Sequence, residues 1–175
     1  MRFVVLIGAS GAGKTTIARA LAQRHTDEIA VFYFDSIGVP SVDQMIAECG
    51  SGEEWQRVKT IEWMAKLAPR TRSGSGLLFE GQTRLSFLAQ GAKAAGRLPY
   101  WPVLVDCDDE TRSRRLSLER KQPELANENM MNWARYLRRA AQKSGCEILE
   151  TSRLSLDQCV TRVMARLREN PSGNP

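Results

Sequence analysis

The stretch "GASGAGKT", residues 8–15, decides how the rest of the chain is interpreted. It matches the pattern G-x-x-x-x-G-K-S/T, in which glycines let the backbone curl so that its N–H groups point inward. The apolar run at residues 3–7 precedes it and predicts a buried strand, and a helical pattern begins at about Lys14. A strand, a glycine-rich turn and a helix N-terminus in this order form a cradle for phosphate oxygens.

The side chains of this loop predict a bound triphosphate with its metal. We expect Lys14 to reach the β- and γ-phosphates as a catalytic residue, and Thr15 to place its hydroxyl on Mg²⁺. No N-K-x-D guanine-reading pattern follows, which favours ATP over GTP. Residues 150–155 either support the adenine or form a plain strand-to-helix turn. The expected nucleotide-binding residues are Gly8, Ala9, Ser10, Gly11, Ala12, Gly13, Lys14, Thr15 and Thr16.

Composition points to one globular domain. The chain has 175 residues, of which 42% are hydrophobic, enough for a single domain over residues 1–170 with a frayed tail at 171–175. The net charge of +5 suits an anionic small ligand or a nucleic acid equally. Four scattered cysteines without a C-x-x-C pair argue against a zinc site or a disulfide framework. With no apolar run long enough for a membrane span, we expect a cytoplasmic protein.

Strand and helix patterns alternate along the chain. This alternation predicts an α/β fold with a five-stranded parallel sheet and helices on both faces. Ligands of such sheets lie at the carboxyl ends of the strands, where we expect Asp35, Glu80 and Asp106 to meet. The expected strands are 3–7, 29–34, 77–80, 102–106 and 147–150, and capping boxes at Ser41/Gln44, Ser51/Glu54 and Ser155/Gln158 open three of the helices.

Further segments carry a family resemblance: the strand that ends at Asp35, "FEGQTR" at 79–84, and "VLVDCDDETRSRRLSLER" at 103–120. Together with the loop at residue 8, they make nearly the whole chain similar to the small P-loop kinases, which include nucleoside monophosphate, shikimate and gluconate kinases. The resemblance implies a P-loop NTPase fold and ATP-dependent transfer of phosphate with Mg²⁺. It also implies an acceptor-binding insertion at about residues 36–72 and an arginine-rich lid at about 112–143.

The resemblance gives "EGQTR" a role between donor and acceptor. It implies that Glu80 holds Mg²⁺ through water, that Gly81 lets the backbone approach the acceptor, and that Gln82 hydrogen-bonds it. Arg84 would clamp an anionic acceptor group, because a guanidinium grips a carboxylate or phosphate with two donors. The alternative is a Glu–Arg surface pair that caps the next helix. Asp106 is a rival metal carboxylate, but in similar families the third strand usually lies beside the loop strand, which favours Glu80.

Asp35 and the lid arginines complete the expected catalytic set. By resemblance, Asp35 holds an acceptor hydroxyl or acts as its base, and the alternative is a turn or cap aspartate. A single acid here departs from the D-x-D pair of shikimate kinases. We expect a basic helix over residues 111–121, in which Arg115 and Arg120 close over the ATP phosphates in the transition state. Arg112 and Arg114 are weaker candidates, and a solvated basic helix is the alternative.

The acceptor itself has no motif. The insertion contains Arg57, a candidate acceptor-binding residue, and Trp55 and Trp63, which either anchor the core, the slightly favoured interpretation, or stack on a ring. The first hypothesis is therefore a kinase for a small-molecule or nucleotide acceptor. An ATP-binding or ATP-hydrolysing regulatory protein and a nucleic-acid-end kinase are the alternatives, although no nucleic-acid-binding module is visible. The sequence does not indicate an oligomeric state.

Overall fold

The computed structural model describes residues 2–72 and 74–169 and contains the expected parallel sheet. The strands lie in the order β2-β3-β1-β4-β5, and every neighbouring pair is parallel. β3 lies directly beside β1, as the resemblance implied. The expected tail at 171–175 falls outside the described residues. The strands are β1 (Phe3–Ile7), β2 (Ile29–Tyr33), β3 (Gly76–Gly81), β4 (Trp101–Asp106) and β5 (Glu147–Glu150).

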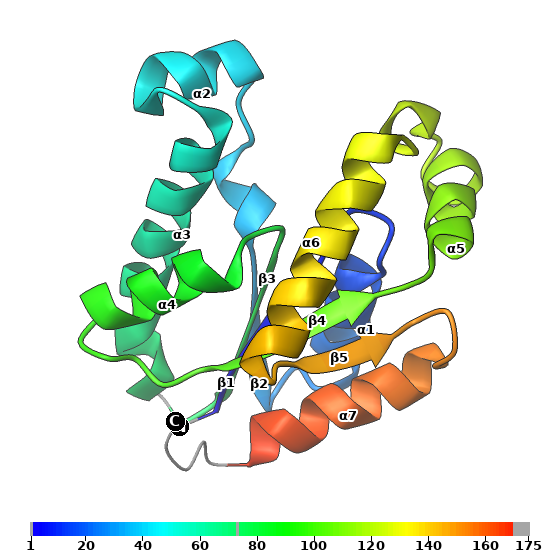
Figure 1. Cartoon of the computed structure of the whole chain (residues 1–175). Helices are drawn as coiled ribbons and strands as arrows, with labels where there is room; N and C mark the ends of the chain where they lie inside the picture. The colour runs from blue at the N-terminus through cyan, green and yellow to red at the C-terminus, as the bar shows by residue number, and fades with distance from the viewer. Residues whose placement is uncertain (1, 73, 170–175) are drawn as a thin grey trace.

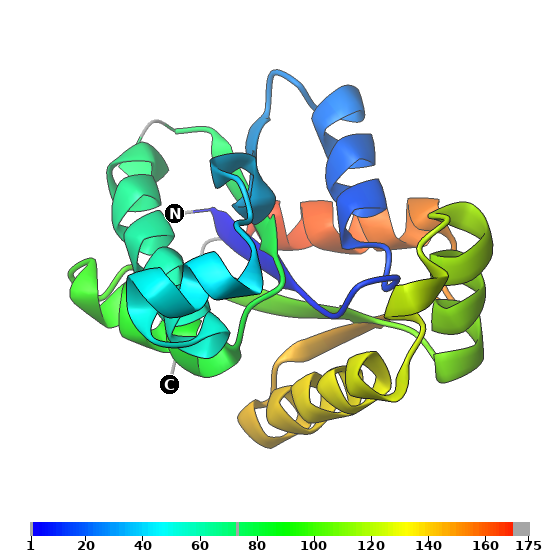
Figure 2. The ribbon, with the colours of Figure 1, turned by 90° about the horizontal axis from the view of Figure 1, so that it is seen from above.

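Helices cover both faces of this sheet, which confirms the predicted three-layer arrangement (Figures 1 and 2). Helices α1 and α7 lie against one face, and α3, α4 and α6 lie against the other. The helices are α1 (Lys14–Arg24), α2 (Val42–Cys49), α3 (Gly52–Leu67), α4 (Leu85–Ala94), α5 (Asp109–Arg114), α6 (Glu128–Ser144) and α7 (Leu156–Arg168). Short 3₁₀ turns occupy Phe34–Ile37, Ala68–Arg72 and Pro123–Leu125, and a π-helical turn occupies Arg115–Glu119.

The two faces of β1 explain its unbroken apolar sequence. Val4 and Leu6 pack with α1 and α7, while Phe3, Val5 and Ile7 pack with α3, α4 and α6. A central parallel strand has no solvent-facing side, so apolar residues at every position are stabilising. This central position holds the loop that follows β1 at the carboxyl edge of the sheet.

The capping predictions are confirmed at two of three helices. Ser41 and Ser155 both form reciprocal capping boxes. Ser51 accepts a hydrogen bond from the Glu54 N–H, but the Glu54 carboxylate turns to Arg57, so the box at α3 is only half formed. The ion pair with Arg57, one helical turn away, competes with the cap for the Glu54 carboxylate.

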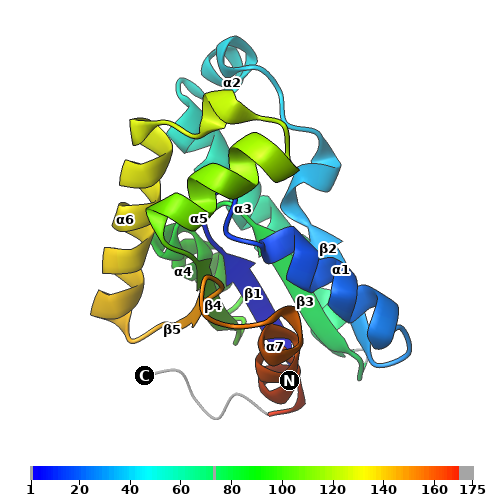
Figure 3. The same cartoon turned by 90° about the vertical axis from the view of Figure 1, so that its right-hand side faces the viewer.

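The basic segment differs from the single helix expected over residues 111–121. Asp108 accepts a hydrogen bond from the Thr111 N–H at 2.7 Å, and this cap starts α5 two residues earlier than expected, at Asp109. The helix then changes to the π-helical turn Arg115–Glu119. Figure 3 shows α5 beside the loop that joins β1 to α1. The earlier start and the wider turn set which arginines face that loop.

Two projections stand above the carboxyl edge of the sheet. Helices α2 and α3 rise on one side, and α5 with the first turns of α6 rises on the other (Figure 1). The loop between β1 and α1 lies between them (Figure 2). Within the described residues, no helix combines the length and the apolar character needed to cross a membrane.

Candidate active site

The loop after β1 has the backbone that its glycines predict. Gly8 has a φ of 152°, and a Cβ atom there would lie 2.2 Å from the carbonyl oxygen of Val105. Gly13, just before α1, has a φ of 100° in the left-handed region, which residues with side chains rarely adopt. Glycine is therefore required at both ends of the curl, and the N-terminus of α1 points into its concave side.

Lys14 is the buried cation of this site. Its side chain is 8% exposed, and its Nζ donates a hydrogen bond to the Ala9 carbonyl at 3.3 Å. Burial lowers the pKa of Lys14, while the negative charges of Glu80 and Asp35 raise it. The site thus brings together three charged residues that the sequence separates widely, as expected for the carboxyl edge of a parallel sheet.

Thr15 and Glu80 form a hydroxyl–carboxylate pair beside Lys14. The Thr15 Oγ1 donates to Glu80 Oε1 at 3.0 Å, and Glu80 is only 6% exposed. Burial raises the pKa of Glu80, and the neighbouring Lys14 lowers it. In the described part of the chain, no three His, Cys, Asp or Glu side chains gather into a metal cage. One hydroxyl and one carboxylate nevertheless fit Mg²⁺, which usually keeps several waters and takes phosphate oxygens.

Asp35 lies in the 3₁₀ turn after β2, opposite the loop. Its carboxylate is exposed, yet it is close enough to Lys14 and Glu80 to raise the pKa of both. Within the described residues, the Asp35 side chain forms no hydrogen bond, and the cap position of its turn belongs to Tyr33. The cap role that the sequence left open is therefore not observed, and the carboxylate is available to a ligand.

Gln82 connects the loop to α3. The Ser10 hydroxyl donates to Gln82 Oε1 at 3.2 Å, and Gln56 Nε2 on α3 donates to the Gln82 carbonyl at 2.7 Å. Gly81, one residue earlier, packs so closely that a Cβ atom there would lie 2.6 Å from the Cβ of Phe34. Sequence reasoning missed Gln56, because nothing in a helical pattern shows that an amide meets a strand-end carbonyl.

Arg84 lies just beyond, before α4. Its Nη2 donates to Glu53 Oε2 on α3 at 2.6 Å. The guanidinium also lies over the aromatic rings of Phe87 and of two residues on α6, Trp133 and Tyr136, at 5.1–5.4 Å from the ring centroids. Arg84 is thereby held between three helices, with the Glu53 carboxylate as its anionic partner.

The other candidates of the acceptor segment are also paired or buried. Arg57 contacts Glu54 at 2.5 Å and Gln90 at 3.2 Å. Trp55 and Trp63 are each 4% exposed within the aromatic part of the core, which confirms their interpretation as core anchors.

The two lid arginines occupy different positions. Arg115 donates to Thr151 Oγ1 at 2.8 Å and to the Gly11 carbonyl at 3.3 Å, so it spans the loop and the turn after β5. Arg120 is exposed, and its charge lowers the pKa of Lys14. Both line a hollow of about 250 Å³ together with Lys14, Thr15 and Thr16 of the loop.

A second hollow continues from the first toward the turn after β5. Its volume is about 180 Å³, and its lining includes Gly13, Thr16, Thr151 and Leu154. Residues 150–155, which the sequence left open between an adenine support and a plain turn, therefore contribute directly to a cavity. The two hollows share Gly13, Thr16, Arg115 and Glu119 in their linings.

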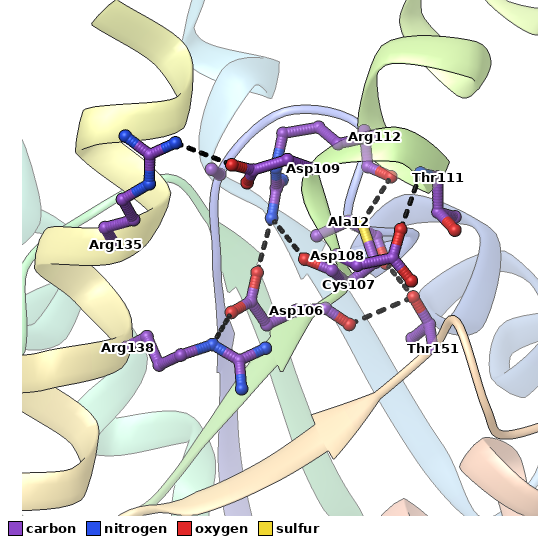
Figure 4. A network of polar contacts seen from close by, with 12 residues as sticks. Ala12, Asp106, Cys107, Asp108, Asp109, Thr111, Arg112, Arg135, Arg138 and Thr151 are labelled. Atoms are coloured by element: carbon purple, nitrogen blue, oxygen red, sulfur yellow. Dashed lines mark hydrogen bonds and ion pairs between the residues drawn. The ribbon is translucent and has the colours of Figure 1, made fainter. Parts of the chain in front are cut away.

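Asp106, the rival metal carboxylate, lies elsewhere. It is 3% exposed and pairs with Arg112 and Arg138, as Figure 4 shows. The Thr15 hydroxyl instead meets Glu80. The order of strands is the reason, because β3 and β4 flank β1 on opposite sides.

Comparisons with known proteins agree with this fold. The family described as AAA domain matches residues 4–131. Among solved structures, a sugar kinase from Janibacter sp. is 19% identical, with a TM-score of 0.65, over 95% of this chain and 94% of its own. A shikimate kinase from Acinetobacter baumannii is 18% identical, with a TM-score of 0.58, over 94% and 91%.

A gluconokinase from Sinorhizobium meliloti 1021 is 15% identical, with a TM-score of 0.61, over 94% of this chain and 90% of its own. No curated protein matches the sequence significantly. Identities this low establish the fold alone, whereas the family match covers most of the chain. The protein therefore belongs to the AAA domain family and has the fold of the small P-loop kinases.

Proposed function

We propose that this protein is a kinase that transfers the γ-phosphate of Mg-ATP to a small-molecule or nucleotide acceptor. The observation that carries the proposal is the meeting of Lys14, the Thr15–Glu80 pair and Asp35 at one edge of the sheet. Phosphoryl transfer needs alignment and neutralisation of charge more than covalent chemistry from the protein. These residues supply both on the donor side and leave one free carboxylate on the acceptor side.

The donor would be ATP, lying along the two hollows beside the loop. The loop N–H groups and Lys14 would bind the β- and γ-phosphates, and the hollow at Thr151 and Leu154 would take the adenine. Arg120 reaches the phosphate end of this cavity, where a cation stabilises charge that develops during transfer. Arg115, which is bonded to the loop, would support both ends.

Thr15 and Glu80 are the residues that would hold Mg²⁺. The hydroxyl would bind the ion, and Glu80 would hold it directly or through water, which also balances the buried negative charge of this carboxylate. When bound, the ion neutralises the β- and γ-phosphate oxygens. The two arginine partners of Asp106 support the choice of Glu80 over Asp106 for this role.

Asp35 would orient the acceptor hydroxyl and take its proton. The acceptor oxygen forms a bond to the γ-phosphorus, the bond between that phosphorus and the β–γ bridging oxygen breaks, and ADP leaves. The hydroxyl proton passes to the Asp35 carboxylate, which is exposed and free of hydrogen bonds in the described structure. The closeness of Asp35 to Lys14 supports this role, because Lys14 would hold the transferred phosphate.

The acceptor would be a compound that carries hydroxyl groups. The similar structures are named for sugar, shikimate and gluconate, and one was solved with shikimate. Gln82 offers an amide toward such a ligand, with its backbone held by Gln56. An anionic acceptor would replace Glu53 as the partner of Arg84, whereas a neutral acceptor would leave the Arg84–Glu53 ion pair in place. Both classes therefore belong in the test.

The experiment is a panel of sugars, polyols, hydroxy acids, nucleosides and nucleotides incubated with Mg-ATP, with products detected by mass. We expect one class to gain a single phosphate with equal release of ADP, and Lys14→Ala to remove the product. Hydrolysis of ATP without any phosphorylated acceptor would instead favour a regulatory ATPase. Phosphate on oligonucleotide ends, with strong dependence on salt, would favour a nucleic-acid-end kinase.

A further inference from the structure

Arg112 on α5 is a fully buried cation that the proposed reaction does not use. Its side chain is 0% exposed. The Nη1 group donates to the Ser10 carbonyl at 2.7 Å, and Nη2 donates to the Cys107 carbonyl at 3.3 Å and pairs with Asp106. Figure 4 shows the guanidinium of Arg112 reaching from α5 toward Asp106. An arginine is almost never fully buried without a specific set of partners.

The contacts of Arg112 are directed at the backbone of the phosphate-binding loop. The carbonyls of three consecutive residues each meet a donor from outside the loop: Ser10 meets Arg112, Gly11 meets Arg115, and Ala12 meets Thr151. In a planar trans peptide, the carbonyl and the N–H of the next residue point in opposite directions. A donor that fixes the Ser10 carbonyl therefore also fixes the direction of the Gly11 N–H.

Arg112 is itself held by a chain of charges from three other elements. Asp106 at the end of β4 is 3% exposed and accepts a second hydrogen bond, from Arg138 Nε on α6, at 2.8 Å. Arg138 in turn donates to Glu150 at the end of β5 at 2.6 Å. The network thus places a rigid cation behind the loop, and a guanidinium can contact Asp106 and the Ser10 carbonyl at once because its donors form a planar fork.

Packing against Arg112 also restricts Gly11, in addition to the hydrogen bond to the Ser10 carbonyl. Gly11 has a φ of 78°, and a Cβ atom there would lie 3.1 Å from the Cγ of Arg112 and 3.1 Å from the Cγ of Leu116. The stem of Arg112 is therefore the surface on which this residue of the loop rests. Hydrogen bonding and packing act on the same peptide unit.

We propose that Arg112 is a positioning residue, which acts through the Ser10–Gly11 peptide to hold the loop in its phosphate-binding shape. It touches neither the nucleotide nor the acceptor. Its effect should appear in nucleotide affinity, because a loop whose N–H groups are not oriented in advance must be ordered by the ligand. This inference rests on the loop binding a nucleotide, and it does not depend on which acceptor is used.

The test is Arg112→Lys, which retains the charge beside Asp106 but lacks the planar fork. We expect the affinity for Mg-ADP, measured by calorimetry, to fall about tenfold, the scale of one hydrogen bond from a charged donor. The Gly11 amide should exchange hydrogen faster, while the amide of Val4 in β1 should keep its protection. The matched control is Arg114→Lys, an exposed arginine on the same helix, which should change neither quantity.

A second variant covers the outcome in which Arg112→Lys does not fold. The double variant Arg112→Met with Asp106→Asn removes both charges, and Arg138 keeps Glu150 as its partner. Replacing a whole buried ion pair is often neutral for stability. We expect this variant to fold and to bind Mg-ADP as weakly as Arg112→Lys.

Three results would overturn the inference. One is a folded variant of either kind with wild-type affinity for Mg-ADP, and another is weaker affinity with an unchanged Gly11 amide. The third is failure of both variants to fold, which would assign Arg112 to stability alone. A wild-type protein that binds Mg-ADP but phosphorylates no acceptor would contradict the proposed kinase activity, while the affinities would still decide the role of Arg112.

Discussion

The loop after β1 and the segment at residues 36–72, which we propose as the acceptor segment, hold their polar groups in opposite ways. Around the loop, three charged side chains are buried: Lys14 is 8% exposed, Glu80 6% and Arg112 0%. In the acceptor segment, α2 buries none of its residues, and ion pairs such as Arg57–Glu54 lie near the surface. The first region is fixed by desolvated contacts, and the second is held by contacts that solvent screens.

This difference matches the two ligands. A triphosphate presents the same oxygens in every reaction, so a rigid, buried cradle serves all of them. The acceptor is what distinguishes one kinase from another, and exposed ion pairs contribute only about 0–1 kcal/mol each, so they can exchange partners with a ligand at little cost. We therefore expect substitutions near the loop to have large effects and substitutions in the acceptor segment to have small, substrate-specific ones.

The largest effect should come from Lys14→Ala. Removal of the only lysine of the loop takes away the cation that meets the transferred phosphate, and losses of about 100-fold or more follow from removing one such group. Rates of product formation measure the effect, and circular dichroism checks the fold. Normal turnover by this variant would mean that the loop is not the donor site.

Glu80→Gln should have the second largest effect on phosphate transfer. The change removes the carboxylate beside Thr15 but keeps its shape, so we expect transfer to fall about tenfold or more and the Mg²⁺ concentration for half-maximal activity to rise. A titration of activity against Mg²⁺ measures this. An unchanged Mg²⁺ requirement would show that Glu80 is not the metal carboxylate.

The matched substitution Asp106→Asn sharpens that result. Asp106 pairs with the fully buried Arg112, so its loss leaves this cation without its carboxylate and should destabilise the fold by about 3 kcal/mol, whereas the half-buried Arg138 keeps Glu150 as its partner. Urea unfolding measures this free energy. If the Asp106→Asn protein were stable and needed more Mg²⁺, Asp106 rather than Glu80 would be the metal carboxylate.

Arg84→Ala addresses the acceptor side. Arg84 bridges Glu53 and three aromatic rings at the edge of the acceptor segment, and its loss should raise the acceptor KM about tenfold while sparing ATP binding. The control is Lys66→Ala on the same segment, which lies over Trp63 and should change neither constant. If ATP affinity fell and acceptor use did not, the division into donor and acceptor regions would be wrong.

The smallest effect concerns pH. Burial raises the pKa of Glu80 above the ordinary 4.5, so the folded protein binds this proton more tightly than the unfolded chain. The contribution of Glu80 to stability is therefore favourable at low pH and is lost as the pH rises from 4.5 through the raised pKa. As the pH rises through this range, and without nucleotide, the melting temperature of the Glu80→Gln variant should fall less than that of the wild type. If the melting temperatures of the two proteins changed equally with pH, the raised pKa of Glu80 would be contradicted.

Much of the donor side is readable from the sequence because its signals are local. The loop pattern, the apolar run before it and the acids that end the strands each occupy a few consecutive residues. Parallel strands then bring their ends together by topology, which is how Asp35 and Glu80 were placed near Lys14. The choice of Glu80 over Asp106 needed the order of the strands, which came from the family resemblance.

The remaining contacts join residues that are far apart in sequence, and no local pattern encodes them. Arg112 looks like one member of a solvated basic run, and only its partners Asp106 and Ser10 reveal that it faces inward. Arg84 likewise meets Trp133 on a helix that the sequence describes only as amphipathic. Such pairings depend on where helices dock, which propensity and periodicity do not determine.

The central claim is tested most directly by following the terminal phosphate of ATP. A label on the γ-phosphate would be traced after incubation with Mg²⁺ and the pooled acceptor panel. We expect the label to appear in an organic product in equal amount to ADP, and we expect Lys14→Ala to remove it. Label found only in inorganic phosphate, or retained in ATP while the protein binds it, would contradict a kinase.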